Sequence, residues 1–179
     1  MGFKTWLRKI FWFITGGMGK YSILTHGQDV PLEDINIIRT TARHAKAIHA
    51  LDKECFSDPW SFSSLKHDIN LKHSVCFVAV SGSIILGHII MQQIIDEGHI
   101  HNIAVSKYVR RQGIGRGLLE AAISESGILG IKSLTLEVRS QNHTAISLYE
   151  KLGFKTCGRR KNYYRKPVDD ALVMKKEDL

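Results

Sequence analysis

The stretch RRQGIGRG at residues 110–117 places glycine at every second position, at Gly113, Gly115 and Gly117. A predicted strand precedes it, and an apolar run after it predicts a helix. The first amides of a helix lack intrahelical partners and lie at the positive end of its dipole, so such a turn can bind phosphate groups. Glycine leaves the backbone open to a ligand, and the neighbouring arginines add positive charge. The pattern matches neither the Walker motif nor the dinucleotide-binding motif, so an ordinary glycine-rich turn is the alternative.

A second candidate for chemistry is a carboxylate in the segment KSLTLEVRS, residues 132–140. Apolar and polar residues alternate here, which predicts a strand with Glu137 on its polar face. Burial disfavours the ionised form of a carboxylate, so Glu137 could accept a proton near neutral pH. An edge strand with a solvated polar face, or a surface pair of Glu137 with Arg139, would explain the same pattern.

The next segment, NHTAISLYEKLG, predicts a helix with Asn142 as its N-cap and Gly153 just after its last turn. Tyr149 lies nearly two turns after Asn142, so the two side chains share a face about 10 Å apart along the axis. A tyrosine can donate a proton to a leaving group. Packing of Tyr149 in the core is the simpler explanation of the spacing alone.

Two histidines, His99 and His101, alternate on a predicted strand and therefore share one face. We expect them to serve the structure or to line the substrate site, because further ligands at a fixed spacing are lacking and a metal site is not predicted. The segment KTCGRRKNYYRK, residues 155–166, combines basic and aromatic residues, as nucleic-acid-binding segments do. It falls on a predicted hairpin, however, and we expect no stable nucleic-acid binding.

The elements that must position these residues are predicted from residue 35 onward, in the order strand, two helices, three strands, helix, strand, helix and two strands. This order predicts an α/β or α+β domain with a mixed, mostly antiparallel central sheet flanked by helices. The helices are expected at 42–56, within 56–69 after a turn at Pro59, at 113–130 and at 142–153. The strands are expected at 35–41, within 74–94 around a turn at 81–83, and at 97–105, 132–140, 154–164 and 169–177.

Residues 1–34 differ in character from the rest of the chain. Apolar residues recur at helical spacing among basic ones within residues 1–15, which is typical of an amphipathic helix that rests on lipid or on the protein body. A leader without fixed structure is the alternative. We therefore expect an N-terminal extension over residues 1–34 and a folded domain over residues 35–179.

The composition is that of a globular protein, with 44% hydrophobic and 23% charged residues among 179. The formal net charge of +8 favours anionic partners. Cys55, Cys76 and Cys157 are far apart and form no CxxC pair, so we expect small buried residues in a reducing cytoplasm. No apolar run reaches the length of about 18 residues that crosses a bilayer.

The glycine stretch resembles the phosphate-binding signature of the GNAT acetyltransferase superfamily, through Gln112, Gly115 and Gly117. Six further motifs follow the order and spacing of one subfamily, the bacterial ribosomal-protein-alanine N-acetyltransferases. The resemblance covers about residues 35–176, and seven motifs in register are far more specific than any one of them. The six are FSDPWS (56–61), HNIAV (101–105), LEVRSQN (136–142), AISLYEKLGF (145–154), RKNYY (160–164) and DDALVM (169–174).

The resemblance implies a role for each matching residue. Glu137 matches the family's general base, Tyr149 the proton donor to the departing thiolate, and Asn142 the CoA-binding asparagine. Acetyl-CoA would lie across the strand at Ile103, Ala104 and Val105, where the strands 99–105 and 132–139 splay apart, and no metal ion would be needed. Its pyrophosphate would rest on Arg111, Gln112, Gly113, Ile114, Gly115 and Arg116.

The implied reaction transfers an acetyl group from acetyl-CoA to the N-terminal α-amino group, on alanine, of a small-subunit ribosomal protein. An α-amino group with a pKa near 7.7–8.0 is roughly a tenth neutral at pH 7, against under about a thousandth for a lysine near 10.4, so one modest base suffices. The first alternative is an N-acetyltransferase of another protein N-terminus, a lysine or a small amine. The second is a non-catalytic acetyl-CoA-binding module, or a membrane-surface module that uses residues 1–15.

Overall fold

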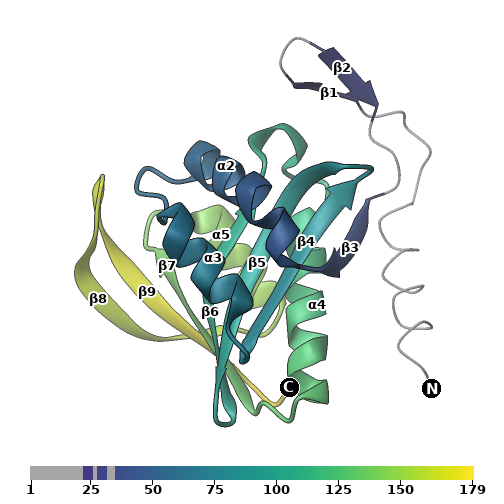
Figure 1. Cartoon of the computed structure of the whole chain (residues 1–179). Helices are drawn as coiled ribbons and strands as arrows, with labels where there is room; N and C mark the ends of the chain where they lie inside the picture. Colours follow the sequence, from purple (N-terminus) through teal and green to yellow (C-terminus); the bar gives the residue numbers. More distant parts are fainter. Residues whose placement is uncertain (1–21, 26–27, 32–34) are drawn as a thin grey trace.

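The computed structural model describes residues 22–25, 28–31 and 35–179 (Figure 1). The amphipathic helix predicted within residues 1–15 lies outside these residues. Two short strands, β1 (Ser22–Thr25) and β2 (Gln28–Pro31), pair with each other and not with the main sheet. The sequence pattern predicted no strand there, because four residues are too few for an alternation to be recognised.

A seven-stranded sheet forms the centre of the domain, in the order β3-β4-β5-β6-β7-β9-β8. Neighbouring strands are antiparallel, except for the parallel pair β6 and β7. The predicted order of elements and the mostly antiparallel sheet are therefore confirmed. The bounds are β3 (Asn36–Arg39), α2 (Ala45–Cys55), α3 (Phe62–Asn70), β4 (Ser74–Ser81), β5 (Ile84–Ile94), β6 (Glu97–Val105), α4 (Ile114–Ile128), β7 (Ser133–Arg139), α5 (His143–Lys151), β8 (Lys155–Arg165) and β9 (Val168–Glu177).

Helices cover both faces of this sheet, with α2 and α3 on one side and α4 and α5 on the other (Figure 1). Strands β4 and β5 lie between these layers, which is why their sequences are apolar on both faces. The larger core lies between the sheet and α4, around Ile89 and Leu118. A smaller core lies beneath α2 and α3, around Ile48, Leu65 and Cys76. Among the described residues, no helix is both long and apolar enough to span a membrane.

Gly87 lies in β5 where β6 and α4 approach its backbone closely. An added Cβ would lie 2.9 Å from the Ala104 carbonyl oxygen and 3.1 Å from Leu118 Cδ1. Because a strand carbonyl cannot move without disturbing the sheet, we expect Gly87→Ala to lower the free energy of unfolding by about 1–3 kcal/mol in urea denaturation. Gly158→Ala is the matched control, since its added Cβ would lie 3.7 Å from Val173 Cβ, an ordinary contact. An equal loss in both variants would contradict this account.

Candidate active site

The parallel strands β6 and β7 are hydrogen-bonded to each other at one end only. Their pairing stops after Ile100, which lies opposite Leu136, although both strands continue. At the same point β6 contains a bulge, because Ile100 and Asn102 pair with consecutive residues of β5 and His101 has no partner there. A bulge bends a strand and increases its local twist. Beyond Ile100 the two strands therefore diverge and leave a wedge between them.

The edge of β6 that faces this wedge carries the backbone groups of alternate residues. Ser106 N donates to a β5 carbonyl, that of Leu86, at 2.8 Å. The amide and carbonyl of one residue point to the same side and alternate along a strand, so those of Ile103 and Val105 point away from β5. In agreement, Val105 O accepts a hydrogen bond from Arg110 Nε at 3.2 Å. The wedge therefore offers a strand edge to an extended ligand, and the side chain of Ala104 is buried behind it.

A pocket of about 620 Å³ lies at the point of divergence. Its walls come from the end of α2 and the loop after it, from β6, from β7 with the start of α5, and from the tip of the β8–β9 hairpin. Of the residues predicted for the site, it brings together Ile103, Glu137, Asn142 and Tyr149. The glycine turn at 111–116 does not line this pocket.

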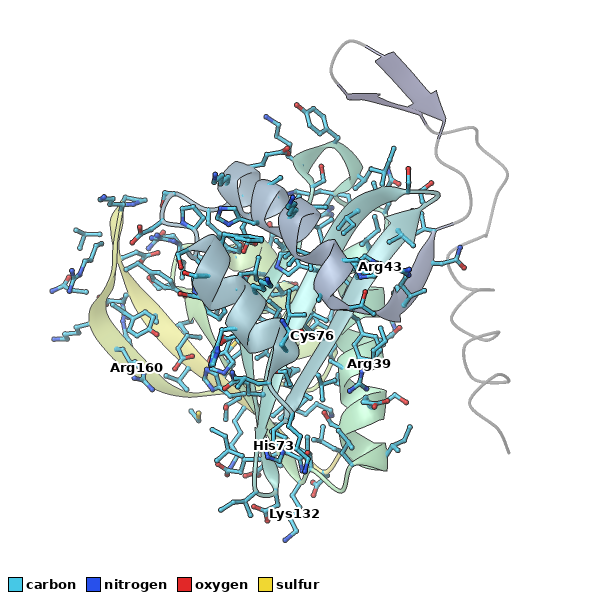
Figure 2. All side chains as sticks on the ribbon, in the orientation of Figure 1. Arg39, Arg43, His73, Cys76, Lys132 and Arg160 are labelled. Atoms are coloured by element: carbon cyan, nitrogen blue, oxygen red, sulfur yellow. The ribbon has the colours of Figure 1, made fainter. Side chains whose placement is uncertain are left out.

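Glu137 lies in the pocket wall with its side chain only 9% exposed. Its Oε2 lies 3.0 Å from His99 Nε2, and its Oε1 lies 3.1 Å from Nη2 of Arg160, which projects from β8 (Figure 2). The carboxylate is therefore held between β6 and β8. Neither partner was predicted for Glu137; the basic segment at 155–166 was the one signal that could have indicated Arg160.

Tyr149 packs in the core, as the simpler interpretation of its spacing predicted, and it also lines the pocket. Its side chain is buried, and its ring lies edge-on to Phe154 at a centroid distance of 5.9 Å. Burial, with a smaller contribution from Tyr164, raises the pKa of the Tyr149 phenol above its ordinary range. The hydroxyl therefore keeps its proton at physiological pH, as a proton donor must.

Asn142 begins α5 and reaches the pocket from the end of β7. Its Oδ1 accepts a hydrogen bond from Ala145 N at 3.2 Å, which confirms the predicted N-cap. Gly153 follows the helix in the left-handed region, with φ 90°, which confirms the predicted helix end. Within the described part of the chain, Asn142 Nδ2 has no hydrogen-bond partner and can donate to a ligand.

The glycine turn before α4 contains two left-handed residues, Arg111 with φ 67° and Gly113 with φ 82°. Gly113 is the N-cap of α4, and only glycine adopts this conformation without strain. Gly115 abuts the end of β6 and α5, since an added Cβ would lie 3.6 Å from Val105 Cγ2 and 3.5 Å from Leu148 Cδ2. The first amides of α4 therefore open beside the end of the wedge, in the arrangement that binds phosphate.

The side chains of this turn differ in how well they can reach a bound anion. Ile114 is buried in the core, so only its backbone can face a ligand. Arg116 Nε donates to Glu120 Oε1 at 2.8 Å, one turn further along α4. Gln112 is half-buried, whereas Arg111 is exposed. The backbone amides and Arg111 are thus the groups of this turn that are best placed to meet an anion.

The tip of the β8–β9 hairpin is fastened on both sides of the pocket. Arg139 donates from Nη1 to Pro167 O at 2.9 Å and from Nη2 to Lys166 O at 2.8 Å, and its guanidinium lies 4.2 Å from the centre of the Tyr164 ring. Ser57 Oγ, in the loop after α2, donates to the same Lys166 carbonyl. Arg139 therefore serves the hairpin, and the alternative of a surface pair with Glu137 is not realised.

A buried polar cluster, which the sequence did not reveal, lies behind the pocket. Asp52 and His88 are fully buried, with Asp52 Oδ1 3.2 Å from His88 Nε2. Asp52 Oδ2 accepts a hydrogen bond from Asn102 Nδ2 at 3.1 Å, and Asn102 also lines the pocket. These contacts fix α2 to β5 and β6. The one signal for them was an aspartate on the apolar face of a predicted helix.

The three cysteines are free and differ in burial. Cys76 is buried as predicted, Cys55 is partly buried, and the prediction is wrong for Cys157, which is exposed. Burial raises the pKa of the Cys55 thiol, which keeps its proton and donates to Val105 O at 3.5 Å. Within the described ranges, no group of three or more His, Cys, Asp or Glu side chains could hold a metal ion.

A mixed sheet whose parallel pair opens beside a glycine turn at a helix N-terminus defines the class of this protein as an acyl-CoA-using transferase of the GNAT fold. Residues 45–154 match the acetyltransferase (GNAT) family. The chain belongs to this family, and it is an acetyl-CoA-dependent N-acetyltransferase. The resemblance inferred from the sequence motifs is thereby confirmed.

Two relatives and two solved structures show which acetyltransferases of this family the chain is similar to. The [ribosomal protein bS18]-alanine N-acetyltransferase of Escherichia coli (strain K12) is 35% identical over 130 residues, which are 72% of this chain and 87% of that one. The enzyme of the same name from Haemophilus influenzae is 35% identical over 135 residues, covering 71% and 88%. The crystal structure of the ribosomal-protein-S18-alanine N-acetyltransferase from Escherichia coli superposes with a TM-score of 0.76 at 32% identity, covering 80% and 93%. A NatC complex bound to Gag peptide and CoA gives a TM-score of 0.73 at 26% identity, covering 81% and 99%.

Proposed function

We propose that this enzyme transfers an acetyl group from acetyl-CoA to the N-terminal α-amino group, on alanine, of a small-subunit ribosomal protein. The observation that carries the proposal is that Glu137 and Tyr149 line one pocket, in a chain that is 35% identical to enzymes named for that reaction. The transferase domain comprises residues 35–179, because every strand of the seven-stranded sheet lies within it, and residues 1–34 precede it as an extension.

The wedge and the glycine turn fit acetyl-CoA in shape and in hydrogen-bonding groups. The edge of β6 that faces the wedge, at the backbone of Ile103 and the amide of Val105, would hold the extended pantetheine arm, and Asn142 Nδ2 would donate to it. Bound acetyl-CoA supplies an acetyl group activated as a thioester. The anionic end would rest on the helix N-terminus, through the backbone of the turn at Arg111, Gln112, Gly113, Ile114, Gly115 and Arg116 and through the Arg111 side chain.

The residues of the pocket divide the proton transfers between them. Glu137 takes the proton from the acceptor amine, directly or through a water molecule, so that the nitrogen lone pair becomes the nucleophile. The amides of Ile103 and Val105 face the wedge and can stabilise negative charge on the acyl oxygen. Tyr149 gives its proton to the departing thiolate, and the second proton that the nitrogen loses as the amide forms restores the phenol.

The protonation of the acceptor favours an α-amine over a lysine. An α-amino group has an ordinary pKa near 7.7–8.0 and a lysine near 10.4, so the neutral fraction at pH 7 differs by more than about a hundredfold. A site with one carboxylate base suits the more acidic amine at the end of a chain.

An acetylation assay over several acceptors tests this proposal. One peptide carries the N-terminus of the small-subunit ribosomal protein with its free α-amine on alanine, a second has that amine blocked and a free lysine, and a third acceptor is a polyamine. We expect turnover with the first alone. Turnover with the second or third acceptor would contradict the proposal and indicate an enzyme that acetylates lysine or small amines. Mass spectrometry of ribosomal proteins from cells with and without the gene then identifies the N-terminus that loses one acetyl group.

A substitution at Gly115 tests whether the anionic end of acetyl-CoA binds at the start of α4. We expect Gly115→Val to weaken acetyl-CoA binding at least tenfold in calorimetry, because a branched side chain would press on Val105 and Leu148 and displace the first turn of α4 from the wedge. Gly127→Ala is the matched control in the same helix, since the nearest atom to its added Cβ lies at 4.0 Å. Unchanged affinity in the folded Gly115→Val variant would contradict this placement.

A further inference from the structure

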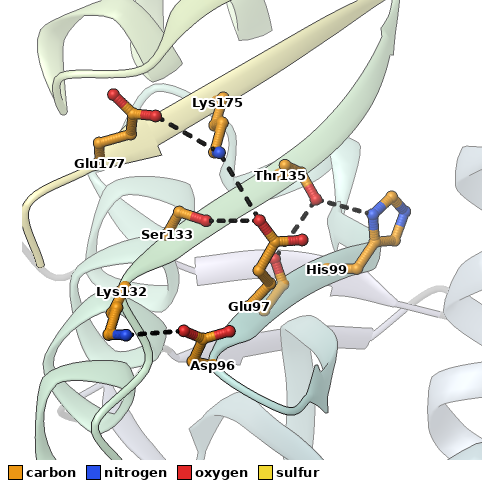
Figure 3. A network of polar contacts seen from close by, with 9 residues as sticks. Asp96, Glu97, His99, Lys132, Ser133, Thr135, Lys175 and Glu177 are labelled. Atoms are coloured by element: carbon orange, nitrogen blue, oxygen red, sulfur yellow. Dashed lines mark hydrogen bonds and ion pairs between the residues drawn. The ribbon is translucent and has the colours of Figure 1, made fainter.

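His99 lies between the candidate base and a hydroxyl group on the neighbouring strand. Its Nε2 lies 3.0 Å from Glu137 Oε2. Its Nδ1 lies 2.9 Å from Thr135 Oγ1 (Figure 3). Thr135 and His99 pair across β7 and β6 within the short stretch where these strands are hydrogen-bonded. The imidazole is therefore held at both nitrogens in the hydrogen-bonded stretch that precedes the wedge, with its side chain 28% exposed.

The Thr135 hydroxyl can satisfy this imidazole in either of its charge states. When the ring is protonated, Nδ1–H donates to Thr135 Oγ1, and the hydroxyl donates onward to Gly98 O, 3.4 Å away. When the ring is neutral and keeps its proton on Nδ1, the same two hydrogen bonds remain, and Nε2 carries the lone pair that faces Glu137 Oε2. Because a hydroxyl both donates and accepts, Thr135 keeps both hydrogen bonds when Nε2 gains or loses a proton. The Gly98–Thr135–His99–Glu137 chain thus accommodates one added proton without moving a heavy atom.

The second histidine on this face does not compete for that proton. The rings of His99 and His101 lie 4.7 Å apart. Burial, and then the neighbouring His99, lower the pKa of His101, so His101 is uncharged at neutral pH. The other charged or titratable groups that face the pair are Glu97 on β6, Arg160 and Tyr164 on β8, Lys175 on β9 and Asp68 on α3.

We propose that His99 is the resting place of the proton that Glu137 removes from the acceptor amine. This inference rests on the proposed function. The ammonium group gives a proton to the Glu137 carboxylate and keeps the N–H electron pair as the lone pair that attacks. Glu137 passes a proton to His99 Nε2, which leaves a carboxylate and an imidazolium, and Arg160 on the other oxygen favours this distribution. His99 acts through Glu137 and is a positioning and proton-holding residue.

The pH dependence of kcat distinguishes this role from a merely structural one. A free histidine titrates near 6.5 and a free glutamate near 4.3, so an imidazole-linked base and a lone carboxylate lose activity in different acid ranges. We expect His99→Gln to move the acid limb of the kcat profile down by more than one pH unit and to lower the plateau about tenfold, because a weaker base remains. Thr135→Val should move the limb in the same direction, and Thr135→Ser, which restores the hydroxyl, should return it.

His101→Gln is the matched control for this profile. It removes an imidazole from the same face of β6, and no hydrogen bond or ion pair joins His101 to Glu137 in the described part of the chain. Its acid limb should stay at the wild-type position. If the limb of His99→Gln also stays there, the inference is overturned, whatever happens to the plateau, while acetylation of the peptide by the wild type would leave the proposed function standing.

A titration without turnover supplies a second readout. In protein labelled with ¹³C-histidine, the imidazole signal that disappears in His99→Gln identifies His99 among the nine histidines. We expect its midpoint to fall in Glu137→Gln, because a neutral amide no longer favours the imidazolium, and to stay in place in Glu97→Gln. A midpoint that is the same in wild type and Glu137→Gln overturns the inference even if the peptide acceptor is the wrong one.

Discussion

Glu137→Gln is expected to lower kcat for acetylation of the N-terminal peptide by about 10²–10⁴-fold. The substitution keeps the shape of the side chain and one acceptor oxygen, but it removes the group that can take a proton from the amine. The dissociation constant for acetyl-CoA should change little, because Glu137 contacts His99 and Arg160 rather than the β6 edge. Steady-state kinetics with calorimetry measures both quantities.

Glu97→Gln controls for the loss of one negative charge from the neighbouring strand β6. Glu97 lies in β6, two residues before His99, and meets Lys175 at 3.6 Å in an exposed position (Figure 3). Exposed pairs of this kind contribute little, so its kcat should stay within about twofold of wild type. A folded Glu137→Gln enzyme with wild-type kcat would remove Glu137 from the role of base.

Tyr149→Phe is expected to lower kcat by about 10²-fold or more while the protein stays folded. Only the hydroxyl is lost, and the edge-on packing of the ring against Phe154 remains. Because burial raises the pKa of Tyr149, the wild-type phenol holds its proton through the alkaline range, and the loss in the variant should be the same at pH 7 and pH 9.

Tyr108→Phe is the control for removal of a phenol hydroxyl. Tyr108 is exposed and contacts Lys107 outside the pocket, so its turnover should match wild type. Equal kcat in Tyr149→Phe and Tyr108→Phe would mean that the thiolate leaves without help from Tyr149.

Local patterns in the sequence predicted the elements of this fold well. The alternation in residues 132–140 identified β7 and the face that carries Glu137, and Asn142 with Gly153 marked both ends of α5. These signals are local, since they depend on side-chain period and on the backbone needs of caps. The motifs then related the chain to its family.

The contacts that complete the site could not be predicted in the same way. Arg160 reaches Glu137 from a strand that is next but one in the sheet, and the bulge at His101 depends on how β6 pairs with β5. The buried Asp52–His88 contact joins a helix to a strand far along the chain. Pairing between distant segments leaves no periodic trace in either one, so these partners emerge only from the assembled sheet.

The bulge at His101 has a consequence for affinity. The bulge opens the space between β6 and β7. Because it is part of the backbone pairing, this space is already present once the sheet has formed. A ligand that binds in the wedge does not have to break strand pairing. The backbone around it has already lost its conformational entropy on folding. Preorganisation of this kind lets most of the contact energy appear as binding. Affinity for the cofactor should therefore depend little on temperature-driven loosening of the chain until the sheet itself melts.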